Sequence, residues 1–182
     1  MNTEEPVCVP PEYWEKDNLV YYPKSFNQTN HGGKTKRKLL KTLCFPGLEV
    51  LLLEDLPNLP ALEQEKTIGD RKQVAANLSP NEYLSQTQNN PQYQNEIGLT
   101  PEAWLAYAML YLQTHNRVLD DWQGQGKACC LTGSFLKAFG AVPNAGWSRD
   151  VRQANFYGGY PGARNPSISA RRSVRVGKAK SR

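Results

Sequence analysis

The stretch Thr100–Trp122, TPEAWLAYAMLYLQTHNRVLDDW, contains the strongest helix signal in the chain. Thr100 offers an N-cap hydroxyl, Pro101 suits the first helical position, and Glu102 lies near the positive end of the helix dipole. Apolar side chains then recur at spacings of three or four until glycines appear at positions 124 and 126. We therefore predict a helix from Pro101 to about Trp122 with one buried face. The stripe on that face consists of Trp104, Ala108, Tyr111, His115 and Leu119, widened by Leu105 and Leu112.

Strand patterns follow this helix. Residues 129–142 form an apolar segment interrupted by glycines, and residues 173–176 alternate so that Val174 and Val176 share one side. Both patterns favour strands. A long amphipathic helix followed by strands predicts an α+β fold, with a compact helix-plus-strand region at residues 99–176.

The amino-terminal part has weaker patterns. The first 33 residues carry four prolines around short aromatic clusters, which predicts an irregular arm with one short strand at Val20–Tyr22. The apolar run Leu48–Leu53 is flanked by prolines and predicts a buried strand. Residues 63–98 are rich in Asn and Gln, so we expect a long polar loop or an extended arm there. Residues 1–98 are thus expected to form irregular arms with short strands and a polar loop.

The net charge of +5 comes from the carboxy-terminal end. Residues 171–182 hold six of the 22 Lys and Arg residues and no acid, so the other 16 cations face 17 acids. The pI near 9.0 therefore describes an appendage, which we predict as a basic tail at residues 177–182. A nucleic-acid binder with a wholly basic surface is not implied.

Several classes of protein are disfavoured. No run approaches the roughly 20 apolar residues of a membrane span, and the first residues lack the apolar segment of a secretory signal peptide. We therefore expect a cytoplasmic or virion location and no membrane partner. The cysteines contain no C-x-x-C pair, which argues against a disulfide framework and against a zinc site. They are Cys8, Cys44, Cys129 and Cys130.

A possible nucleotide site fails on its spacing. Residues 31–35, HGGKT, end like a phosphate-binding loop, but Gln28 stands where that motif requires its first glycine. Only His31 and His115 could supply imidazole, and His115 lies on the apolar stripe, where a packed or hydrogen-bonded histidine is expected. We expect no cofactor and no metal.

Asp120 and Asp121 are the candidates for acid–base chemistry. Paired carboxylates can do such work when their environments separate their pKa values. Neighbours on a helix point apart, however, and a solvated helix end or a salt bridge to an arginine of the late segment accounts for both acids. An enzyme would need a pocket that gathers Asp120, Asp121, His115 and an arginine, and we expect a protein that is not an enzyme.

Two basic segments could meet an anionic partner. Residues 34–41, KTKRKLLK, form either a solvated face or a contact for a phosphate backbone or an acidic protein patch. The end of the tail is suited to weak, salt-sensitive contacts. The candidate residues are Lys34, Lys36, Arg37, Lys38, Lys41, Lys178, Lys180 and Arg182.

Residues 147–176, WSRDVRQANFYGGYPGARNPSISARRSVRV, interleave arginines with aromatic residues. Arg and aromatic side chains dominate the energetic centres of many interfaces, so this segment is our candidate recognition surface. An irregular part of a core held by Arg-to-carbonyl bonds would give the same pattern. The candidate partner-binding residues are Trp147, Arg149, Arg152, Asn155, Tyr157, Tyr160, Arg164 and Arg171.

This segment resembles the carboxy-terminal end of C-type-lectin-like folds of the formylglycine-generating-enzyme type, which include variable ligand-binding proteins of diversity-generating retroelements. The residues that carry the resemblance are Trp147, Arg152-Gln153-Ala154-Asn155, Pro161, Arg164 and Ile168-Ser169-Ala170-Arg171. The segment departs from the family where Ala170 replaces an aromatic residue and where no cysteine occurs. The resemblance therefore implies a loop-rich, lectin-like carboxy-terminal half that serves as a scaffold for binding, without formylglycine chemistry.

These observations together lead to an expected function. The leading interpretation is a non-enzymatic binding or structural subunit of a larger assembly, such as a phage or virion particle, with its recognition surface at residues 147–172. The alternative is a subunit of a ribonucleoprotein that contacts nucleic acid through residues 34–41 and 171–182. Steep loss of nucleic-acid affinity with rising salt would separate the alternative from the leading interpretation.

Overall fold

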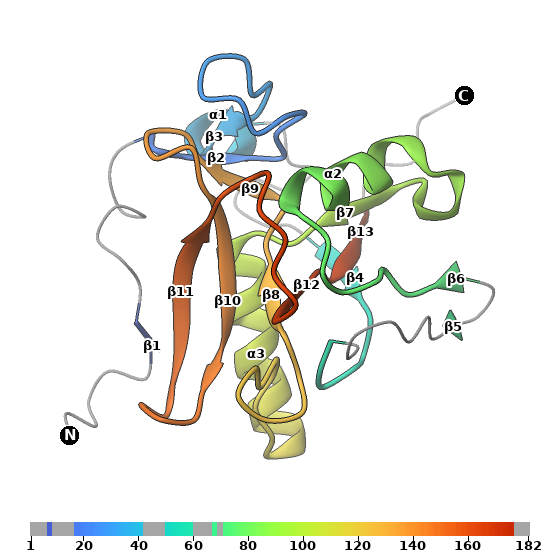
Figure 1. Cartoon of the computed structure of the whole chain (residues 1–182), viewed down its shortest axis with the longest axis vertical. Helices are drawn as coiled ribbons and strands as arrows, with labels where there is room; N and C mark the ends of the chain where they lie inside the picture. Colours follow the sequence, from blue (N-terminus) through green and yellow to red (C-terminus); the bar gives the residue numbers. More distant parts are fainter. Residues whose placement is uncertain (1–6, 9–16, 42–49, 60–66, 69–70, 177–182) are drawn as a thin grey trace.

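The computed structural model describes residues 7–8, 17–41, 50–59, 67–68 and 71–176 (Figure 1). Helices and several small sheets are mixed along the chain, so the α+β class is confirmed. Among the described residues, the largest sheet has the strand order β1-β11-β10-β8-β12. Its strands are β1 (Val7–Cys8), β8 (Ala128–Cys130), β10 (Val142–Ser148), β11 (Gln153–Gly159) and β12 (Ile168–Ser169).

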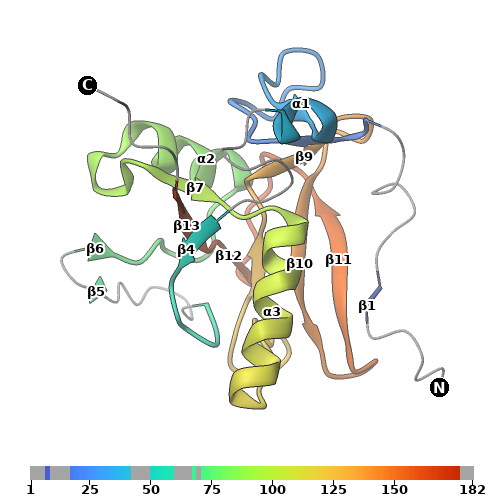
Figure 2. The ribbon, with the colours of Figure 1, turned by 180° about the vertical axis from the view of Figure 1, so that it is seen from behind.

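Helix α3 (Pro101–His115) lies along one face of this sheet, as the view from behind in Figure 2 shows. It begins as predicted, with the Thr100 hydroxyl accepting from the Ala103 N–H at 3.2 Å. It ends seven residues earlier than predicted, because Asn116 adopts the left-handed conformation (φ 50°) that commonly stops a helix. Leu119 is buried in the loop that follows and does not belong to the helix.

The buried face of α3 is narrower than predicted. Trp104 and Tyr111 are buried, and the Trp104 ring meets Phe156 of β11 edge-on at 5.5 Å. Leu112 and His115, both assigned to the stripe, are exposed. The His115 ring stacks on Tyr111 with 4.2 Å between centroids. The helix therefore presents several large apolar side chains to solvent.

Two hydrophobic clusters fill the two faces of the central sheet. Directly opposite residues of an antiparallel pair share a face, and Ala145 pairs with Phe156 on the α3 side. Val142 and Tyr157 belong to the cluster on the other side, where helix α2 (Pro80–Asn89) contributes Tyr83. The sheet therefore has a hydrophobic cluster on each face: α3 packs against one face, and Tyr83 of α2 reaches the cluster on the other.

From Arg71 to Gly98, the described residues of the predicted polar segment 63–98 do not form the long loop that composition predicted. Ser79 and Glu82 form a capping box at the start of α2, with Pro80 at its first position, and a 3-10 turn η2 (Pro91–Tyr93) and strand β7 (Glu96–Gly98) follow. Tyr83 is fully buried and donates through its hydroxyl to the Ile168 carbonyl at 3.2 Å. A few well-placed tyrosines thus anchor a segment whose average composition is polar.

The predicted strand at Leu48–Leu53 exists as β4 (Val50–Leu53), but the prediction that it is buried is wrong. Within the described residues it lies at one end of the sheet β4-β13-β7, next to β13 (Arg172–Val176). Leu52 is 62% exposed. A continuous apolar run cannot by itself distinguish an edge strand from a central one.

The amino-terminal arm is attached through short pairings. Strand β2 (Leu19–Tyr21), predicted at Val20–Tyr22, pairs with β3 (Lys34–Thr35) and with β9 (Ser134–Leu136), and a short helix α1 (Lys36–Leu40) follows β3. A small hairpin joins β5 (Thr67–Ile68) to β6 (Arg71–Lys72). No helix in the described part of the chain is long and apolar enough to cross a membrane.

Candidate functional site

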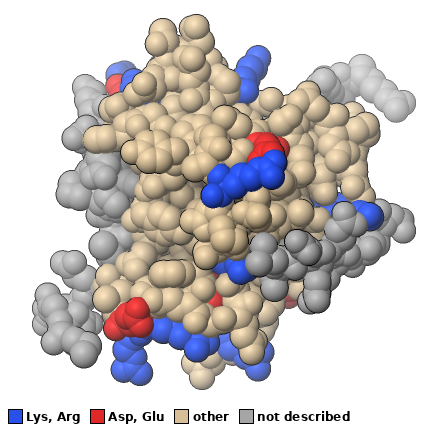
Figure 3. Space-filling model, viewed as in Figure 1, with Lys and Arg blue, Asp and Glu red and all other residues tan. Residues whose placement is uncertain are grey.

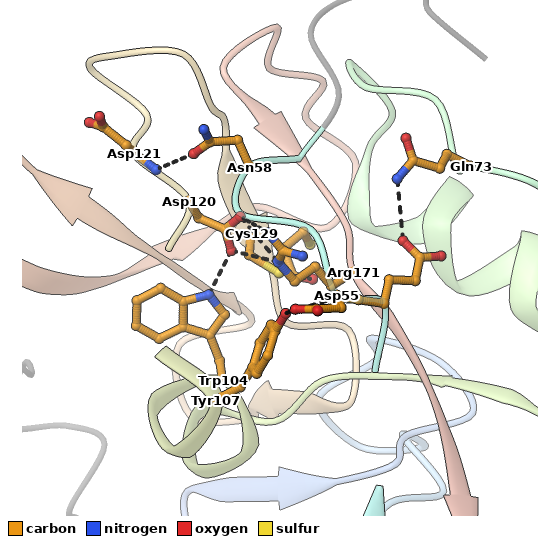
Figure 4. Close-up of polar contacts among 11 residues, drawn as sticks. Asp55, Asn58, Gln73, Trp104, Tyr107, Asp120, Asp121, Cys129 and Arg171 are labelled. Carbon is orange, nitrogen blue, oxygen red and sulfur yellow. Dashed lines mark hydrogen bonds and ion pairs between the residues drawn. The ribbon is translucent and has the colours of Figure 1, made fainter. Parts of the chain in front are cut away.

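The most deeply buried ion pair of the described structure joins the loop after α3 to the segment after β12 (Figure 4). The Arg171 guanidinium donates to both oxygens of Asp120, with Nη2 to Oδ1 at 2.6 Å and Nε to Oδ2 at 3.0 Å. The Trp104 indole N–H donates to Oδ2 of the same carboxylate at 2.8 Å. We call Asp120, Arg171 and Trp104 the Asp120 cluster. None of its side chains is more than 1% exposed.

The residues around the Asp120 cluster shield it from solvent and keep Arg171 charged. Burial lowers the pKa of Arg171, but the charge and hydrogen bonds of Asp120 raise it by more, so the pKa lies above its ordinary value. Burial, followed by the charge of Asp120, raises the pKa of the Cys129 thiol well above its usual range, which keeps this thiol neutral. The Tyr107 ring covers Arg171, with 5.7 Å from the guanidinium carbon to the ring centroid. Such a cluster fixes elements in place and is not exposed to a substrate.

Both acids of the Asp120-Asp121 pair form salt bridges to arginines of the late segment, which confirms one of the two structural interpretations of these acids. Asp121 pairs with Arg149, with Nη2 to Oδ2 at 2.5 Å and Nε to Oδ1 at 3.0 Å. The enzyme alternative required His115 in the same pocket, but His115 is exposed, where it stacks on Tyr111 and contacts the Thr114 hydroxyl. Among the described residues, no three His, Cys, Asp or Glu side chains are grouped to hold a metal ion.

The loop that follows Asp120 is tied to strand β10. The Trp147 N–H donates to the Asp120 carbonyl at 3.0 Å, and the N–H groups of Gly124 and Gly126 donate to the Asp121 carbonyl at 3.0 and 2.9 Å. A Cβ at Gly124 would overlap Arg149 Nη2 and Asp121 Oδ2, so a side chain there would displace this ion pair. The Asp120 cluster therefore positions the loop at residues 121–126 against the β10–β11 hairpin.

Gln123 holds the turn of that hairpin. Its Oε1 accepts from the N–H of Arg149 at 2.5 Å, from the N–H of Asp150 at 3.3 Å and from the Ser148 hydroxyl at 3.2 Å. Its Nε2 donates to Asp150 Oδ2 at 2.5 Å. One amide side chain thus fixes three consecutive residues of the turn from across the loop.

Exposed apolar and cationic side chains project from this corner. Trp122 is 38% exposed and Val151 is 54% exposed. Arg149 and Arg152 are also exposed, and Arg152 adopts a left-handed conformation at φ 54°. We call Trp122, Arg149, Val151 and Arg152 the hairpin-tip surface. Figure 3 shows Lys and Arg side chains gathered along the lower edge of the molecule, where Figure 1 places the β10–β11 turn.

The other predicted partner-binding residues lie elsewhere. Trp147 is half-buried on the α3 face of the sheet, because it pairs with Ala154, whereas Asn155 and Tyr157 are half-buried on the opposite face. Tyr160 follows the far end of β11, which spans roughly 23 Å over its seven residues. The predicted surface at residues 147–172 is therefore divided between the two ends of one strand.

Two of the late arginines, Arg171 and Arg164, form ion pairs within the fold. Arg171, predicted to contact a partner, is 1% exposed and is occupied by Asp120, so it cannot reach a partner at the surface. Arg164 is exposed and pairs with Glu82 at the start of α2. The Arg164 and Ser79 hydrogen bonds lower the pKa of Glu82 to about 2.

Among the described residues, the two predicted basic segments differ in how exposed their cations are. The cations of residues 34–41 are exposed on β3, on α1 and just after it, far from the β10–β11 turn in both Figures 1 and 2, and Lys36 pairs with Glu102 at 3.3 Å. Arg172 is buried beside α2, so neither Arg171 nor Arg172 is available to an anionic partner. Lys178, Lys180 and Arg182 lie outside the described residues.

Comparison of the chain with protein-family models, with curated proteins and with solved structures found no match. The sequence pointed to Arg149 and Arg152 but missed Trp122, Val151 and Gln123. The nearest signal for Trp122 was its position next to the two acids, both of which bond arginines of the late segment.

Proposed function

We propose that this chain is a non-enzymatic binding subunit of a larger assembly and that it contacts a protein partner through the hairpin-tip surface. The observation that carries the proposal is the exposure of Trp122 on the loop at residues 121–126 and of Val151 and two arginines on the β10–β11 turn, which Gln123 holds by hydrogen bonds. Trp and Arg are the residue types most enriched among the energetic centres of protein interfaces. The surface therefore has the composition of a recognition site.

Rigidity supports the same proposal. Binding costs free energy when loops and side chains must be ordered, and a surface that is already ordered avoids much of that cost. Here the turn is held by Gln123, and Arg149 is held by its three hydrogen bonds to Asp121. The Asp120 cluster holds the base of the same loop. The charged side chains of the Asp120 cluster, Asp120 and Arg171, pair with each other in the interior and do not face solvent, which favours binding over catalysis.

The finer assignment of the scaffold is part of the proposal. We propose a C-type-lectin-like scaffold for the carboxy-terminal half on the residues at positions 147–171 that resemble that family. A location in the cytoplasm or in a phage or virion particle is the matching proposal for the assembly. Partners are expected to be protein subunits.

Isolation of the native complex tests the proposed function. The wild-type chain and the double variant Trp122→Ala/Arg152→Ala are purified in parallel from native extracts, and co-purifying proteins are identified by mass spectrometry. Tyr160→Ala is the matched control, since Tyr160 is 75% exposed and lies at the opposite end of β11. A partner that is retained by the control and lost by the double variant supports the proposal. Equal retention by all three chains would contradict it.

A nucleic-acid contact is the second candidate. The observation in its favour is that the cations of residues 34–41 are all exposed. Binding of single-stranded nucleic acid should then fall steeply with salt, and neutralising Lys36, Arg37 and Lys38 should reduce both affinity and salt dependence. Absence of retention at low salt would eliminate this candidate.

A further inference from the structure

Strand β4 presents apolar side chains on both of its faces. Its sequence, Val50-Leu51-Leu52-Leu53, has no charged residue and no proline. Val50 and Leu52 are 43% and 62% exposed, and Val174 of β13 pairs directly with Leu52 and is also exposed. Within the described residues β13 is the strand that pairs with β4, so the other side of β4 is a sheet edge.

The second face of β4 lines a groove against helix α3, and Figure 2 shows the two elements side by side. The groove has a volume of about 360 Å³. Its apolar walls are formed by Leu51, Leu53, Ala103, Ala106, Tyr107 and Leu110. Leu110 is 56% exposed and continues the groove lining along α3, whereas Leu112, about 200° further round the helix, lies on a different side.

An uncharged apolar sheet edge of this kind is unusual in a monomeric protein. Sheet edges in soluble proteins are normally protected by charged residues, prolines, bulges or a covering segment, because their free N–H and C=O groups pair readily with another strand. Large exposed apolar patches mark interaction sites. The described part of β4 has neither a charge nor a proline.

We infer that β4 is a self-association edge, which pairs antiparallel with β4 of a second copy across a two-fold axis. An added strand must be apolar on both faces, because one face meets the groove and the other meets Leu52 and Val174. The strand β4 itself meets this requirement. A two-fold axis brings the same surface of both copies together. Each β4 strand would then be both the open edge and the added strand for the other copy.

Charge does not oppose this pairing. The two acids that follow β4 already have partners, since Glu54 pairs with Arg71 and Asp55 accepts from the Tyr107 hydroxyl at 3.3 Å. The groove itself is also lined by Glu102, which pairs with Lys36 at 3.3 Å. A stable interface buries about 800 Å² on each partner, which four strand residues cannot supply. The proposed dimer must therefore also bury exposed apolar side chains on the groove side of α3, such as Leu110. This self-association goes beyond the proposed function, because β4 and the hairpin-tip surface are separate in Figure 1.

Sedimentation of the full chain over a range of concentrations tests the inference. The wild type should dimerise, and Leu52→Lys should weaken the dimer by at least about tenfold, because it places a charge on each side of the two-fold axis. A lysine at this exposed edge position leaves the fold intact, which the unfolding midpoint checks. Phe139→Lys, which is similarly exposed outside this surface, should leave the dimer unchanged.

Hydrogen exchange of the β4 amides supplies a second readout. Protection of the β4 amides that point away from β13, which alternate along the strand, should increase with protein concentration in the wild type and should not do so in Leu52→Lys. A wild-type monomer, or a dimer that Leu52→Lys leaves intact, would overturn the inference. Protection that is independent of concentration would also overturn it, because another segment of the same chain would then cover the edge. Loss of the dimer with retained partner binding separates this result from a failure of the proposed function.

Discussion

Asp120 and Arg171 are 51 positions apart in the sequence, and their side chains form an ion pair from which solvent is excluded. The pair joins the loop after α3 to the segment between β12 and β13. Removing two charges from water is costly, and here three Arg171–Asp120 hydrogen bonds and one from Trp104 offset that cost. Removing one partner leaves a buried charge without a counterion. The resulting loss in the free energy of unfolding should therefore exceed the net stabilisation that the intact pair provides.

The first prediction concerns this pair. Asp120→Ala leaves the Arg171 charge buried without a partner, so the free energy of unfolding should fall by about 3–5 kcal/mol. Replacing both residues with apolar ones, Asp120→Leu/Arg171→Met, should destabilise less than the sum of the two single changes. Urea denaturation measures both values. Arg149→Met breaks an exposed pair and should have a much smaller effect; equal losses in Asp120→Ala and Arg149→Met would contradict the assignment.

The second prediction concerns the start of α2. The hydrogen bond from Arg164, followed by those from Ser79, lowers the pKa of Glu82 from 4.5 to about 2. A pKa that is lowered in the folded state stabilises the protein above the unfolded value and ceases to do so as pH falls through the folded value. The stability difference between wild type and Glu82→Gln should therefore be constant above about pH 5 and shrink between pH 4.5 and 2.

Arg164→Met is the matched variant for the Glu82 prediction. It removes the first cause of the lowered pKa, so its stability difference from wild type should shrink over the same acidic range. Unfolding by urea at a series of pH values gives both curves. A difference that stays constant down to pH 2 in both variants would show that Glu82 is not stabilised by this pair.

The third prediction compares two glycines. A Cβ at Gly98 would lie 2.6 Å from the Gly133 N and would overlap the Thr132 hydroxyl, whereas a Cβ at Gly162 would meet nothing within 4 Å. Gly98→Ala should therefore lower the free energy of unfolding by roughly 1–3 kcal/mol, as overpacking does, and Gly162→Ala should leave it nearly unchanged. Thermal or urea unfolding checks both. Similar stabilities for the two variants would mean that the contact between β7 and the turn before β9 can relax.

The start of α3 was predictable from the sequence because its signals are local. Thr100, Pro101 and Glu102 act within one helical turn. The end was not predictable from periodicity, since Leu119 continues the apolar spacing although the helix has already stopped at Asn116. The capping box of α2 is also local, but the polar composition around it outweighed that signal. Burial of Tyr83 depends on contacts with residues 75 and 168, which the local sequence does not reveal.

The candidate site was predictable only in part, because some of its signals are local in the sequence and others depend on tertiary contacts. Alternating arginines and aromatic residues pointed to the late segment, and Arg149 and Arg152 do lie on an exposed turn. The sequence could not separate them from Arg171, because the same residue type is exposed at one position and fully buried at the other. Trp122 and Gln123 join the site only through tertiary contacts across a loop and a hairpin.

The last prediction tests the rigidity of the hairpin tip. Gln123→Ala removes the acceptor for the N–H groups of Arg149 and Asp150, so these two amides should exchange with solvent faster, while the amides of α3 should not change. Gln125→Ala is the matched control, since Gln125 is an exposed glutamine of the same loop. Partner affinity should fall by about tenfold in Gln123→Ala, because a mobile turn must be ordered on binding. Unchanged exchange at Arg149 and Asp150, or equal acceleration in Gln125→Ala, would show that Gln123 does not hold the turn.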